Sequence, residues 1–411
     1  MSQLQNSVPP LGARKPRVLI VSFIDIPGGA HNLWRHFVQD PAVAPALELH
    51  LLAPSDYREA DPEPFRSGAV QFHAMTELMP QPLRTRMLSR LTGSVVPERT
   101  RWETRLAAIA PDMVWFNLAG LGDMNWCVPA GEACAARGIP YWLVLQHAQE
   151  EYHFVDDDRT DAALALARGA KRLFTVSMRN RRALERALGA PLPNAESAVN
   201  GVTAATLAAG ERVATAQPPQ VKGPVRMLTL ARFDPTFKGQ DLLLDALASA
   251  EWRTRDWVLT LQGGGSHERL LRRLATNHGF DEARVRLLPH SADVSAAFGA
   301  ADLLVFPSRS EGTPFALVEG MAHGRPAVVT PVGGNDEVVE EGKTGWVAAA
   351  VTVEAIRAAL SRAWVARAAW PAAGYAARER IASQYALGAP HQRLLSALRA
   401  DIGGELLVEG R

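Results

Sequence analysis

The sequence predicts an α/β fold of two doubly wound, Rossmann-like domains that face each other across a cleft. Its 411 residues exceed what one ordinary hydrophobic core holds, so two domains are expected. Short apolar segments alternate with helical stretches in both halves, which is typical of parallel sheets covered on both faces. Polar and glycine-containing loops follow several of these segments, where ligands of such sheets bind.

The net charge, the length of the apolar runs and the cysteines exclude several classes of protein. The formal net charge of +1 gives no argument for nucleic acid as a partner. No apolar run approaches the roughly 20 residues of a membrane-spanning helix. Cys127 and Cys134, the only cysteines, lie too far apart on a predicted helix to form a disulfide. We therefore expect reduced, buried thiols and a cytoplasmic protein, and we expect residues 1–16, which lack a signal-peptide core, to be a disordered tail.

The first domain is predicted over residues 17–205. Strand 17–24 runs into a turn containing Gly28 and Gly29 and then into helix 32–39, a unit that could bind phosphate. Two glycines alone are weak evidence, because many turns use them. Further strands are expected at 47–52, 69–73, 113–117, 141–146 and 172–176.

His147 follows the strand 141–146 directly and is expected to face the cleft. A purely structural role for this histidine is almost as well supported. Arginines crowd two other stretches of the first domain, residues 84–105 and 168–186. They predict either solvated helix faces or a basic surface for an anionic membrane or an acidic acceptor.

Residues 206–223 are predicted to be a linker, because they show no clear hydrophobic period. The second domain is predicted over residues 224–385. Its expected strands are 225–231, 257–262, 284–288, 302–306, 326–330 and, at one edge, 344–347. Its expected helices are 240–249, 268–278, 315–323, 353–368 and much of 372–398.

Residues 307–334 carry most of the functional information. They follow the apolar strand 302–306, and Gly312 gives the loop a permissive backbone. Pro314 is predicted in the first turn of the next helix, where its missing N–H is harmless. The free N–H groups at this helix start make a natural anion site; they belong to Thr313, Phe315 and Ala316.

Two carboxylates bracket this anion site. Glu311 and Glu319 are separated by seven residues, one on the loop and one a turn into the helix. Carboxylates would repel a phosphate, but they accept hydrogen bonds from pairs of sugar hydroxyls. Solvated surface carboxylates are the alternative, and their place at a strand end argues against it. Together these groups predict a nucleotide-sugar site.

Arg232 and Lys238 follow the first strand of the second domain. Two fixed cations at the carboxyl edge of the sheet could neutralise a diphosphate and stabilise it as a leaving group. The alternative is that both are ordinary surface charges.

The segment from Glu311 to Glu319 resembles the E-x7-E motif of retaining glycosyltransferases of family four, which have the GT-B fold. Pro307-Ser308 and residues 333–339 resemble its flanks, and Asn200-Gly201-Val202 matches the end of its first domain. Gly28-Gly29 matches its N-terminal glycine loop. Arg232 and Lys238 stand where this family has its diphosphate-binding residues. The resemblance is dense over residues 225–347 and sparser before them.

The resemblance implies roles for these residues. Glu319 would bind the ribose hydroxyls, Glu311 the donor sugar, and His147 would also meet the donor sugar. The loop residues Gly312, Thr313 and Pro314 would surround the donor, with the amides of Phe315 and Ala316. No metal and no cofactor beyond the nucleoside diphosphate sugar is expected. The last segment, residues 386–411, would be a helix that crosses back to the first domain.

We therefore predict a retaining, metal-independent hexosyltransferase that moves a sugar from a nucleoside diphosphate sugar to an acceptor hydroxyl. The acceptor would be a glycan, a lipid-linked sugar or a small molecule, and the enzyme would be cytoplasmic, with peripheral contact to the inner membrane face as an option. A sugar-nucleotide epimerase and a non-catalytic nucleotide-sugar-binding subunit remain as alternatives.

Three other features have two interpretations. His290 lies in a loop that would approach the nucleotide base, or it packs structurally. Residues 156–158 are three aspartates, which favours helix capping over metal binding. Residues 263–265 are three glycines, predicted to form a tight turn near the nucleotide.

Overall fold

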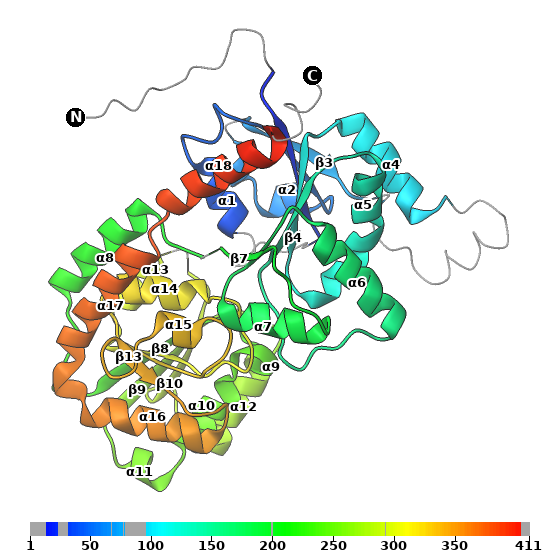
Figure 1. Ribbon diagram of the computed structural model, residues 1–411. Helices are drawn as coiled ribbons and strands as arrows, with labels where there is room; N and C mark the ends of the chain where they lie inside the picture. The colour runs from blue at the N-terminus through cyan, green and yellow to red at the C-terminus, as the bar shows by residue number, and fades with distance from the viewer. Residues whose placement is uncertain are drawn as a thin grey trace, which may run out of the picture.

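The computed structural model describes residues 14–23, 32–66, 68–76, 78, 96–198, 200–291 and 293–403. Figure 1 shows two α/β domains, one holding the blue-to-green first half of the chain and one holding the green-to-orange second half. The predicted fold class is confirmed.

The first domain is built on a parallel sheet of seven strands in the order β3-β2-β1-β4-β5-β6-β7. Its strands are β1 (Arg17–Ser22), β2 (Glu48–Ala53), β3 (Val70–Ala74), β4 (Met113–Leu118), β5 (Tyr141–Leu145), β6 (Arg172–Thr175) and β7 (Ala195–Ser197). Its helices are α1 (Asn32–Gln39), α2 (Tyr57–Ala60), η2 (Glu63–Phe65), α4 (Glu98–Ile109), η3 (Leu121–Asp123), α5 (Met124–Ala136), α6 (Asp157–Gly169) and α7 (Met178–Ala187).

Both faces of this sheet are buried. Leu19 and Val21 of β1 belong to one hydrophobic cluster, whereas Val18 and Ile20 belong to another on the opposite face. Successive side chains of a strand point to opposite faces, so a continuous apolar run such as β1 requires helices on both sides.

The second domain repeats this design with a parallel sheet of six strands in the order β10-β9-β8-β11-β12-β13. Its strands are β8 (Val225–Leu230), β9 (Trp257–Gly263), β10 (Val285–Pro289), β11 (Leu303–Phe306), β12 (Ala327–Val329) and β13 (Gly345–Val347). Its helices are α9 (Pro235–Lys238), α10 (Gln240–Leu247), α11 (Ala250–Arg253), α12 (Glu268–Asn277), α13 (Val294–Gly299), α14 (Phe315–Ala322), α15 (Asn335–Val338), α16 (Val353–Val365), η4 (Arg367–Ala369) and α17 (Trp370–Gln384).

The predicted linker 206–223 is wrong over most of its length, because it contains the end of helix α8 (Ala204–Ala216). The Thr203 side chain caps this helix by accepting from the N–H of Thr206. Gly210 lies against α14, where an added β-carbon would be 2.2 Å from the Ala322 carbonyl oxygen. The segment is therefore a packed helix of the second domain, and its alanine-rich face hid the period.

The chain crosses between the domains twice at one place. The first crossing, at Val202, and the second, at Ala386, form an isolated parallel bridge. The Val202 N–H donates to the Tyr385 carbonyl at 2.8 Å, and the Leu387 N–H donates to the Val202 carbonyl at 2.9 Å. We call this pair of crossings, residues 201–202 and 385–387, the hinge.

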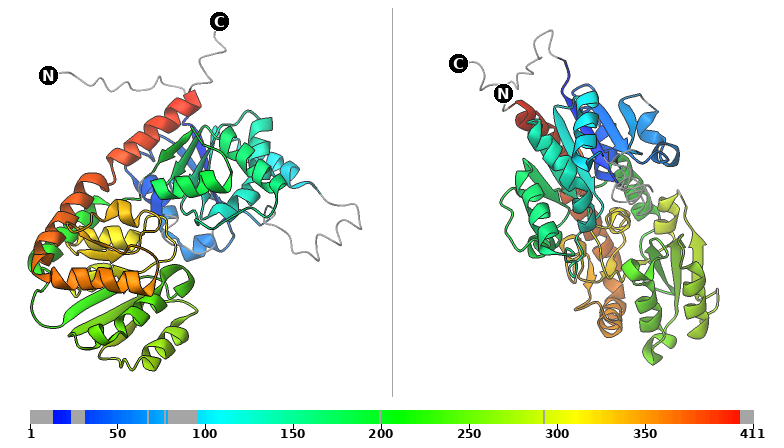
Figure 2. Two further views of the ribbon diagram at one scale, coloured as in Figure 1. Left: turned by 60° about the horizontal axis from the view of Figure 1, so that its bottom comes forward. Right: turned by 90° about the vertical axis from the view of Figure 1, so that its right-hand side faces the viewer.

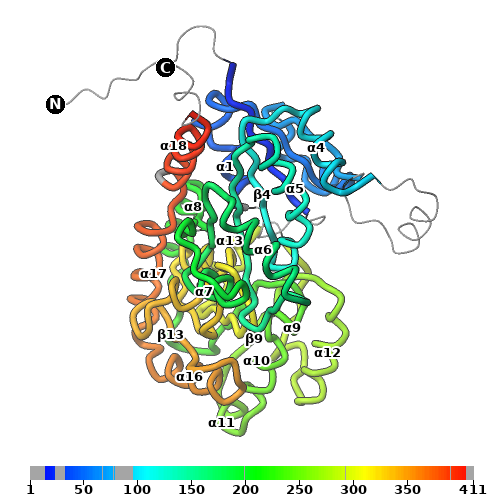
Figure 3. Tube along the Cα trace, turned by 45° about the vertical axis from the view of Figure 1, so that its right-hand side comes forward, coloured from blue at the N-terminus to red at the C-terminus, as the bar shows by residue number. Residues whose placement is uncertain are grey.

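Beyond the hinge, helix α18 (Ala389–Gly403) packs on the first domain. Figures 2 and 3 show α17 of the second domain leading into α18, drawn in red beside the first domain. Leu394, Leu395 and Leu398 join the cluster on one face of the first sheet. Asp401 accepts from Trp142 Nε1 and from Arg172 Nε, each at 2.8 Å.

The cysteines and the N-terminal segment bear on two further predictions. Cys127 and Cys134 are buried free thiols, as predicted. Of the expected tail, residues 1–13 lie outside the described residues, while Arg14 pairs with Asp112 at 2.7 Å. Within the described part of the chain, no helix is both long and apolar enough to cross a membrane.

Candidate functional site

The loop between β11 and α14, residues 307–314, lies at the carboxyl edge of the second sheet. Pro314 precedes the helix in an extended conformation, with φ −71° and ψ 120°, so the prediction that it occupies the first turn is wrong. The residue that caps the start of a helix has non-helical φ and ψ, and this helix begins at Phe315.

Glu311 is held by a cation and a hydroxyl. Lys238 Nζ lies 2.7 Å from Glu311 Oε1 and 2.9 Å from Oε2, and Ser308 Oγ donates to Oε1 at 2.8 Å. Only 7% of the Glu311 side chain is exposed, so this ion pair is sheltered from water. The carboxylate therefore has a fixed position, which a solvated surface group would not have.

Lys238 reaches Glu311 because α9 is bound to the loop. The N–H of Arg309 donates to the Phe237 carbonyl at 2.8 Å. Gly239 has a φ of 61°, and an added β-carbon there would be 2.0 Å from the Pro307 carbonyl oxygen. Glycine is thus required after Lys238 for this close approach.

Arg232 differs from Lys238 in its surroundings. Its side chain is 72% exposed and lies 3.5 Å from Asp234. Its backbone segment contacts the turn 263–265, because an added β-carbon on Gly263 would be 2.1 Å from the Ala231 carbonyl oxygen. Arg232 is therefore a solvent-exposed cation on the same sheet edge, next to the glycine turn.

Glu319 is the second carboxylate of the pair. It lies in α14 and is partly buried, and burial raises its pKa from 4.5 to about 7. No side-chain hydrogen bond of Glu319 occurs among the described residues. A desolvated acceptor without a partner is suited to a ligand that donates hydrogen bonds.

His147 approaches the loop from the first domain. Its Nε2 lies 2.6 Å from Ser310 Oγ, and its ring contacts that of Phe237. Burial lowers the pKa of His147 to about 4; Glu311 opposes this shift and Lys238 adds to it. The imidazole is therefore neutral near pH 7, with one nitrogen that donates and one that accepts.

Two further contacts join the loop to the first domain. Thr313 Oγ1 donates to the Val176 carbonyl at 2.6 Å. Gly312 lies against Gln146, whose side-chain amide donates to Asn117 Oδ1 at 3.0 Å. Asn200 Nδ2 completes this buried amide network with a 3.4 Å contact to Gln146 Oε1.

The start of α14 keeps its anion-binding character. Among the described residues, the N–H groups of Thr313, Phe315 and Ala316 have no backbone acceptor. Phe315 also touches the first domain, where its ring meets that of His36. The predicted anion site at the start of α14 therefore lies at the boundary between the domains.

Not every predicted residue contacts this loop within the described part of the chain. Gly28 and Gly29 lie outside the described residues. His290 follows the edge strand β10 with its side chain exposed. Asp156 caps α6 by accepting from the Arg159 N–H at 2.8 Å, which confirms the capping interpretation. Within the described ranges no cluster of three or more metal-ligating side chains occurs.

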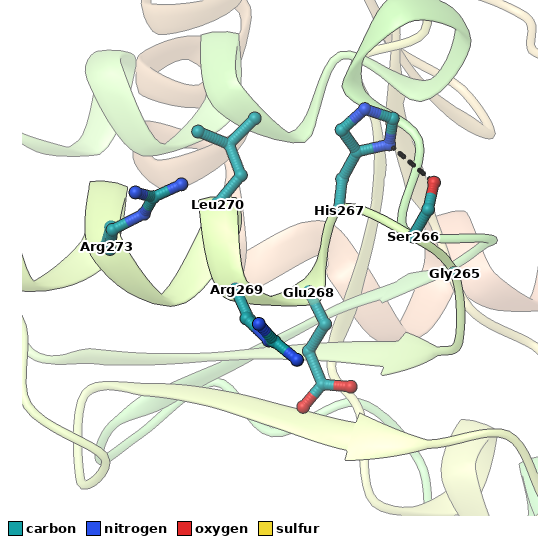
Figure 4. A pocket seen from close by; sticks show the side chains of 7 residues that line it. All are labelled: Gly265, Ser266, His267, Glu268, Arg269, Leu270 and Arg273. Carbon is teal, nitrogen blue, oxygen red and sulfur yellow. Dashed lines mark hydrogen bonds between the residues drawn. The ribbon is translucent and has the colours of Figure 1, made fainter.

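A hollow of about 660 Å³ follows the glycine turn of the second domain. Figure 4 shows Glu268 and Arg269 on one side of the start of α12, and His267, Leu270 and Arg273 on the other. The glycine turn adjoins the segment that carries Arg232, so this hollow continues the sheet edge on which the cations lie.

Sequence reasoning missed the hydroxyls that hold the site together. Ser308 was named only as part of a motif flank and Ser310 was given no role in the site, yet they bond Glu311 and His147. Their position in the same loop as Glu311 was the available signal. The contact of Thr313 with Val176 joins positions far apart in the sequence and had no such signal.

Comparison with known proteins supports the resemblance. Residues 224–364 match the model of the family described as Glycosyl transferases group 1. A GDP-mannose-dependent alpha-(1-6)-phosphatidylinositol monomannoside mannosyltransferase of Mycolicibacterium smegmatis is 28% identical over 360 residues, covering 81% of this chain and 85% of that protein. The protein of the same name from Mycobacterium tuberculosis is 30% identical over 183 residues, which is 43% of this chain and 47% of that protein.

Solved structures agree on the fold. Anabaena HepE in complex with UDP superposes with a TM-score of 0.71 at 18% identity, covering 93% of this chain and 100% of that one. Sucrose-phosphate synthase of Thermosynechococcus elongatus gives a TM-score of 0.72 at 17% identity, covering 95% of this chain and 100% of that one.

The two facing parallel-sheet domains define a protein of the GT-B class. Residues 224–364 of its second domain match the Glycosyl transferases group 1 model, and together with the relatives this match identifies the protein as a glycosyltransferase.

Proposed function

We propose that this glycosyltransferase takes a sugar from a nucleoside diphosphate sugar and transfers it, with retention of anomeric configuration, to an acceptor hydroxyl. The observation that carries the proposal is the cluster of Lys238 and Glu311 at the helix start of α14. It brings a fixed cation of α9 to a loop that carries a fixed carboxylate and free amides, which suits a diphosphate joined to a polyol.

The second domain would hold the donor. Glu319 would accept hydrogen bonds from the ribose hydroxyls, and Glu311 from the donor sugar. The amides of Thr313, Phe315 and Ala316 would bind phosphate oxygens. Arg232, whose side chain is exposed, would turn onto the diphosphate.

The residues would catalyse mainly through charge and position. As the bond between the anomeric carbon and the diphosphate breaks, negative charge grows on the leaving oxygen near Lys238 and Arg232. The acceptor oxygen then bonds to the anomeric carbon on the same face, and its proton passes to the departing phosphate oxygen. Neutral His147 would hold a sugar hydroxyl from the first domain rather than act as an acid.

The proposal includes metal independence, because Lys238 and Arg232 would supply the positive charge that a divalent cation supplies elsewhere. Transfer that persists in EDTA would support it, and strict dependence on added metal would contradict it.

The relatives suggest a donor and an acceptor. Two of them are named GDP-mannose-dependent mannosyltransferases, whereas HepE is bound to UDP, so GDP-mannose is our first candidate donor and UDP-glucose our second. The lipid acceptor in the relatives' names supports a lipid-linked acceptor, and such an acceptor would require contact with a membrane surface. Arg182 and Arg186, both exposed on α7, would favour contact with anionic headgroups.

A panel of UDP, GDP and ADP sugars tests the donor assignment by shifts in the unfolding temperature. The nucleotide sugar that shifts the unfolding temperature most is then incubated with the enzyme, with and without a lipid extract. The free nucleoside diphosphate that is released is measured. Release that depends on the extract supports transfer. Conversion of the donor to an epimer without extract would establish an epimerase, and binding without turnover under either condition would establish a non-catalytic subunit.

A further inference from the structure

Arg179, at the start of α7 in the first domain, is bound to the second domain. Its Nη2 lies 2.6 Å from Asp336 Oδ2 of α15, and its Nη1 lies 3.3 Å from Glu150 Oε1 of its own domain. Figure 1 shows α7 and α15 next to each other where the domains meet. One guanidinium therefore joins a carboxylate from each domain.

The backbone of α7 makes a second contact with the same short helix. Glu337 Oε1 accepts from the Arg179 N–H at 3.2 Å, and the Met178 N–H also donates to this carboxylate. A carboxylate at a helix N-terminus is favoured by the free N–H groups and by the helix dipole. Here the carboxylate comes from the other domain. We call Arg179, Asp336 and Glu337 the interdomain clasp.

The interdomain clasp is connected to the β11–α14 loop. Helix α15 begins directly after Gly333 and Gly334, and the Gly334 N–H donates to the Gly312 carbonyl at 2.6 Å. An added β-carbon on Gly333 would be 2.2 Å from the Glu311 carbonyl oxygen. Because of this close packing, α15 and the loop must move together.

The interdomain clasp is also connected to the hinge. Tyr385, whose carbonyl accepts the Val202 N–H in the hinge, donates its hydroxyl to the Glu337 carbonyl at 3.2 Å. Arg380 Nη2 donates to the same carbonyl at 2.8 Å. Glu337 thus has its backbone anchored beside the hinge and its side chain anchored to the other domain.

We propose that Arg179, Asp336 and Glu337 are positioning residues that fix the angle of the hinge. At this angle His147 of the first domain meets Ser310, and Val176 meets Thr313, so both halves of the site are in register. The side chains of Arg179 and Asp336 are 33% and 32% exposed, so salt can weaken this contact.

The proposal is tested by measuring the distance between the domains in the full-length protein. Nitroxide labels are attached to cysteines introduced by Ala165→Cys on α6 and Ala358→Cys on α16, both exposed positions. Cys127 and Cys134 are buried, which limits background labelling. Pulsed electron resonance then gives the distribution of interdomain distances.

Arg179→Ala is expected to broaden this distribution and shift it to longer distances, and Glu337→Ala to do the same. The matched control is Arg182→Ala, which removes the same charge from an exposed position of α7 and leaves the distribution unchanged. The double variant Arg179→Asp with Asp336→Arg restores the side-chain pair with reversed charges. It is expected to recover the wild-type distance at low salt and to lose it at high salt.

Recovery by the reversed pair distinguishes an interdomain contact from a general loss of stability, which charge reversal would not repair. If Arg179→Ala and Glu337→Ala both give the wild-type distribution at low and at high salt, the interdomain clasp does not set the hinge angle and the proposal is wrong. This result would leave the proposed sugar transfer untouched, because the distance is measured without any substrate.

Discussion

Gly312 of the second domain lies so close to Gln146 of the first that a β-carbon on the glycine would be 2.0 Å from the Gln146 carbonyl oxygen. The contact is between backbones, so no side-chain rotation can relieve it. The approach of the two domains therefore depends on the absence of one methyl group.

Replacing Gly312 by alanine is expected to hold the domains apart. The change leaves each hydrophobic core intact, so the unfolding free energy should fall little, while the radius of gyration from small-angle scattering should rise. Gly120→Ala is the control, because a β-carbon there meets nothing within 4 Å. A Gly312→Ala protein with the wild-type radius and full activity would contradict this expectation.

Lys238→Met should destabilise the protein, because it leaves the carboxylate of Glu311 buried without its cation. Breaking a buried pair costs about 3–5 kcal/mol, and since Lys238 is partly exposed we expect roughly 2 kcal/mol in urea unfolding. Adding Glu311→Gln removes the unpaired charge and should recover part of this loss without restoring turnover. Equal stability of the single and double variants would show that the pair is not sheltered.

Arg232→Ala should affect turnover and leave stability alone. Its side chain is largely exposed, so the unfolding free energy should change by less than about 0.5 kcal/mol. If it stabilises the leaving diphosphate, kcat should fall by about 100-fold. The control variant is Arg286→Ala, which removes an exposed arginine from the edge strand β10 and for which we expect normal turnover.

Glu319 should release a proton when nucleotide binds near pH 7. Burial raises its pKa to about 7, whereas hydroxyl donors favour the ionised form. Calorimetry of GDP and UDP binding at pH 6.5 in two buffers of different ionisation enthalpy measures this proton. Identical enthalpies in the two buffers, or a proton release that survives in Glu319→Gln, would exclude the role of ribose acceptor.

The raised pKa of Glu319 also makes the free energy of unfolding depend on pH. Between pH 4.5 and about 7 the Glu319 carboxyl keeps its proton in the folded protein and loses it in the unfolded chain. The contribution of Glu319 to the free energy of unfolding is therefore present below pH 4.5 and is lost as the pH rises through about 7. Glu319→Gln should therefore gain stability relative to wild type over this interval.

The lowered pKa of His147 should change the free energy of unfolding in the opposite direction. Its pKa falls from 6.5 to about 4, so the unfolded chain binds a proton in this interval that the folded protein excludes. Its contribution to stability is present above pH 6.5 and is lost as the pH falls towards 4. The free energy of unfolding in urea should differ less between pH 5 and pH 7 for His147→Gln than for wild type. An equal difference for both proteins would show that the lowered pKa of His147 is not the cause.

The sequence predicts regular elements and local motifs well, because both rest on short-range patterns. Strand 113–117 and helix 32–39 lie within one residue of β4 and α1. The carboxylate pair, with Lys238, was recognised from residue type and position at strand ends. Lys238 and Glu311 are 73 positions apart, but both follow strands whose carboxyl ends meet at one edge of the sheet.

Contacts between the domains were not predictable in this way. Arg179 was grouped with arginines of a solvated or membrane-facing surface, yet it pairs with Asp336, 157 positions away in another domain. No periodic pattern encodes the relative orientation of two sheets. Likewise α8 lacks a sharp apolar stripe, and β7 has only three residues, so neither was anticipated.

The position of α18 has a consequence for the order in which the protein is made. Trp142 and Arg172, synthesised early, bond to Asp401, which leaves the ribosome only after the whole second domain. Until then one face of the first sheet lacks Leu394, Leu395 and Leu398, and the part of that face under α18 remains open to water or to chaperones. The first domain thus completes its core after the second, although its strands emerge before it.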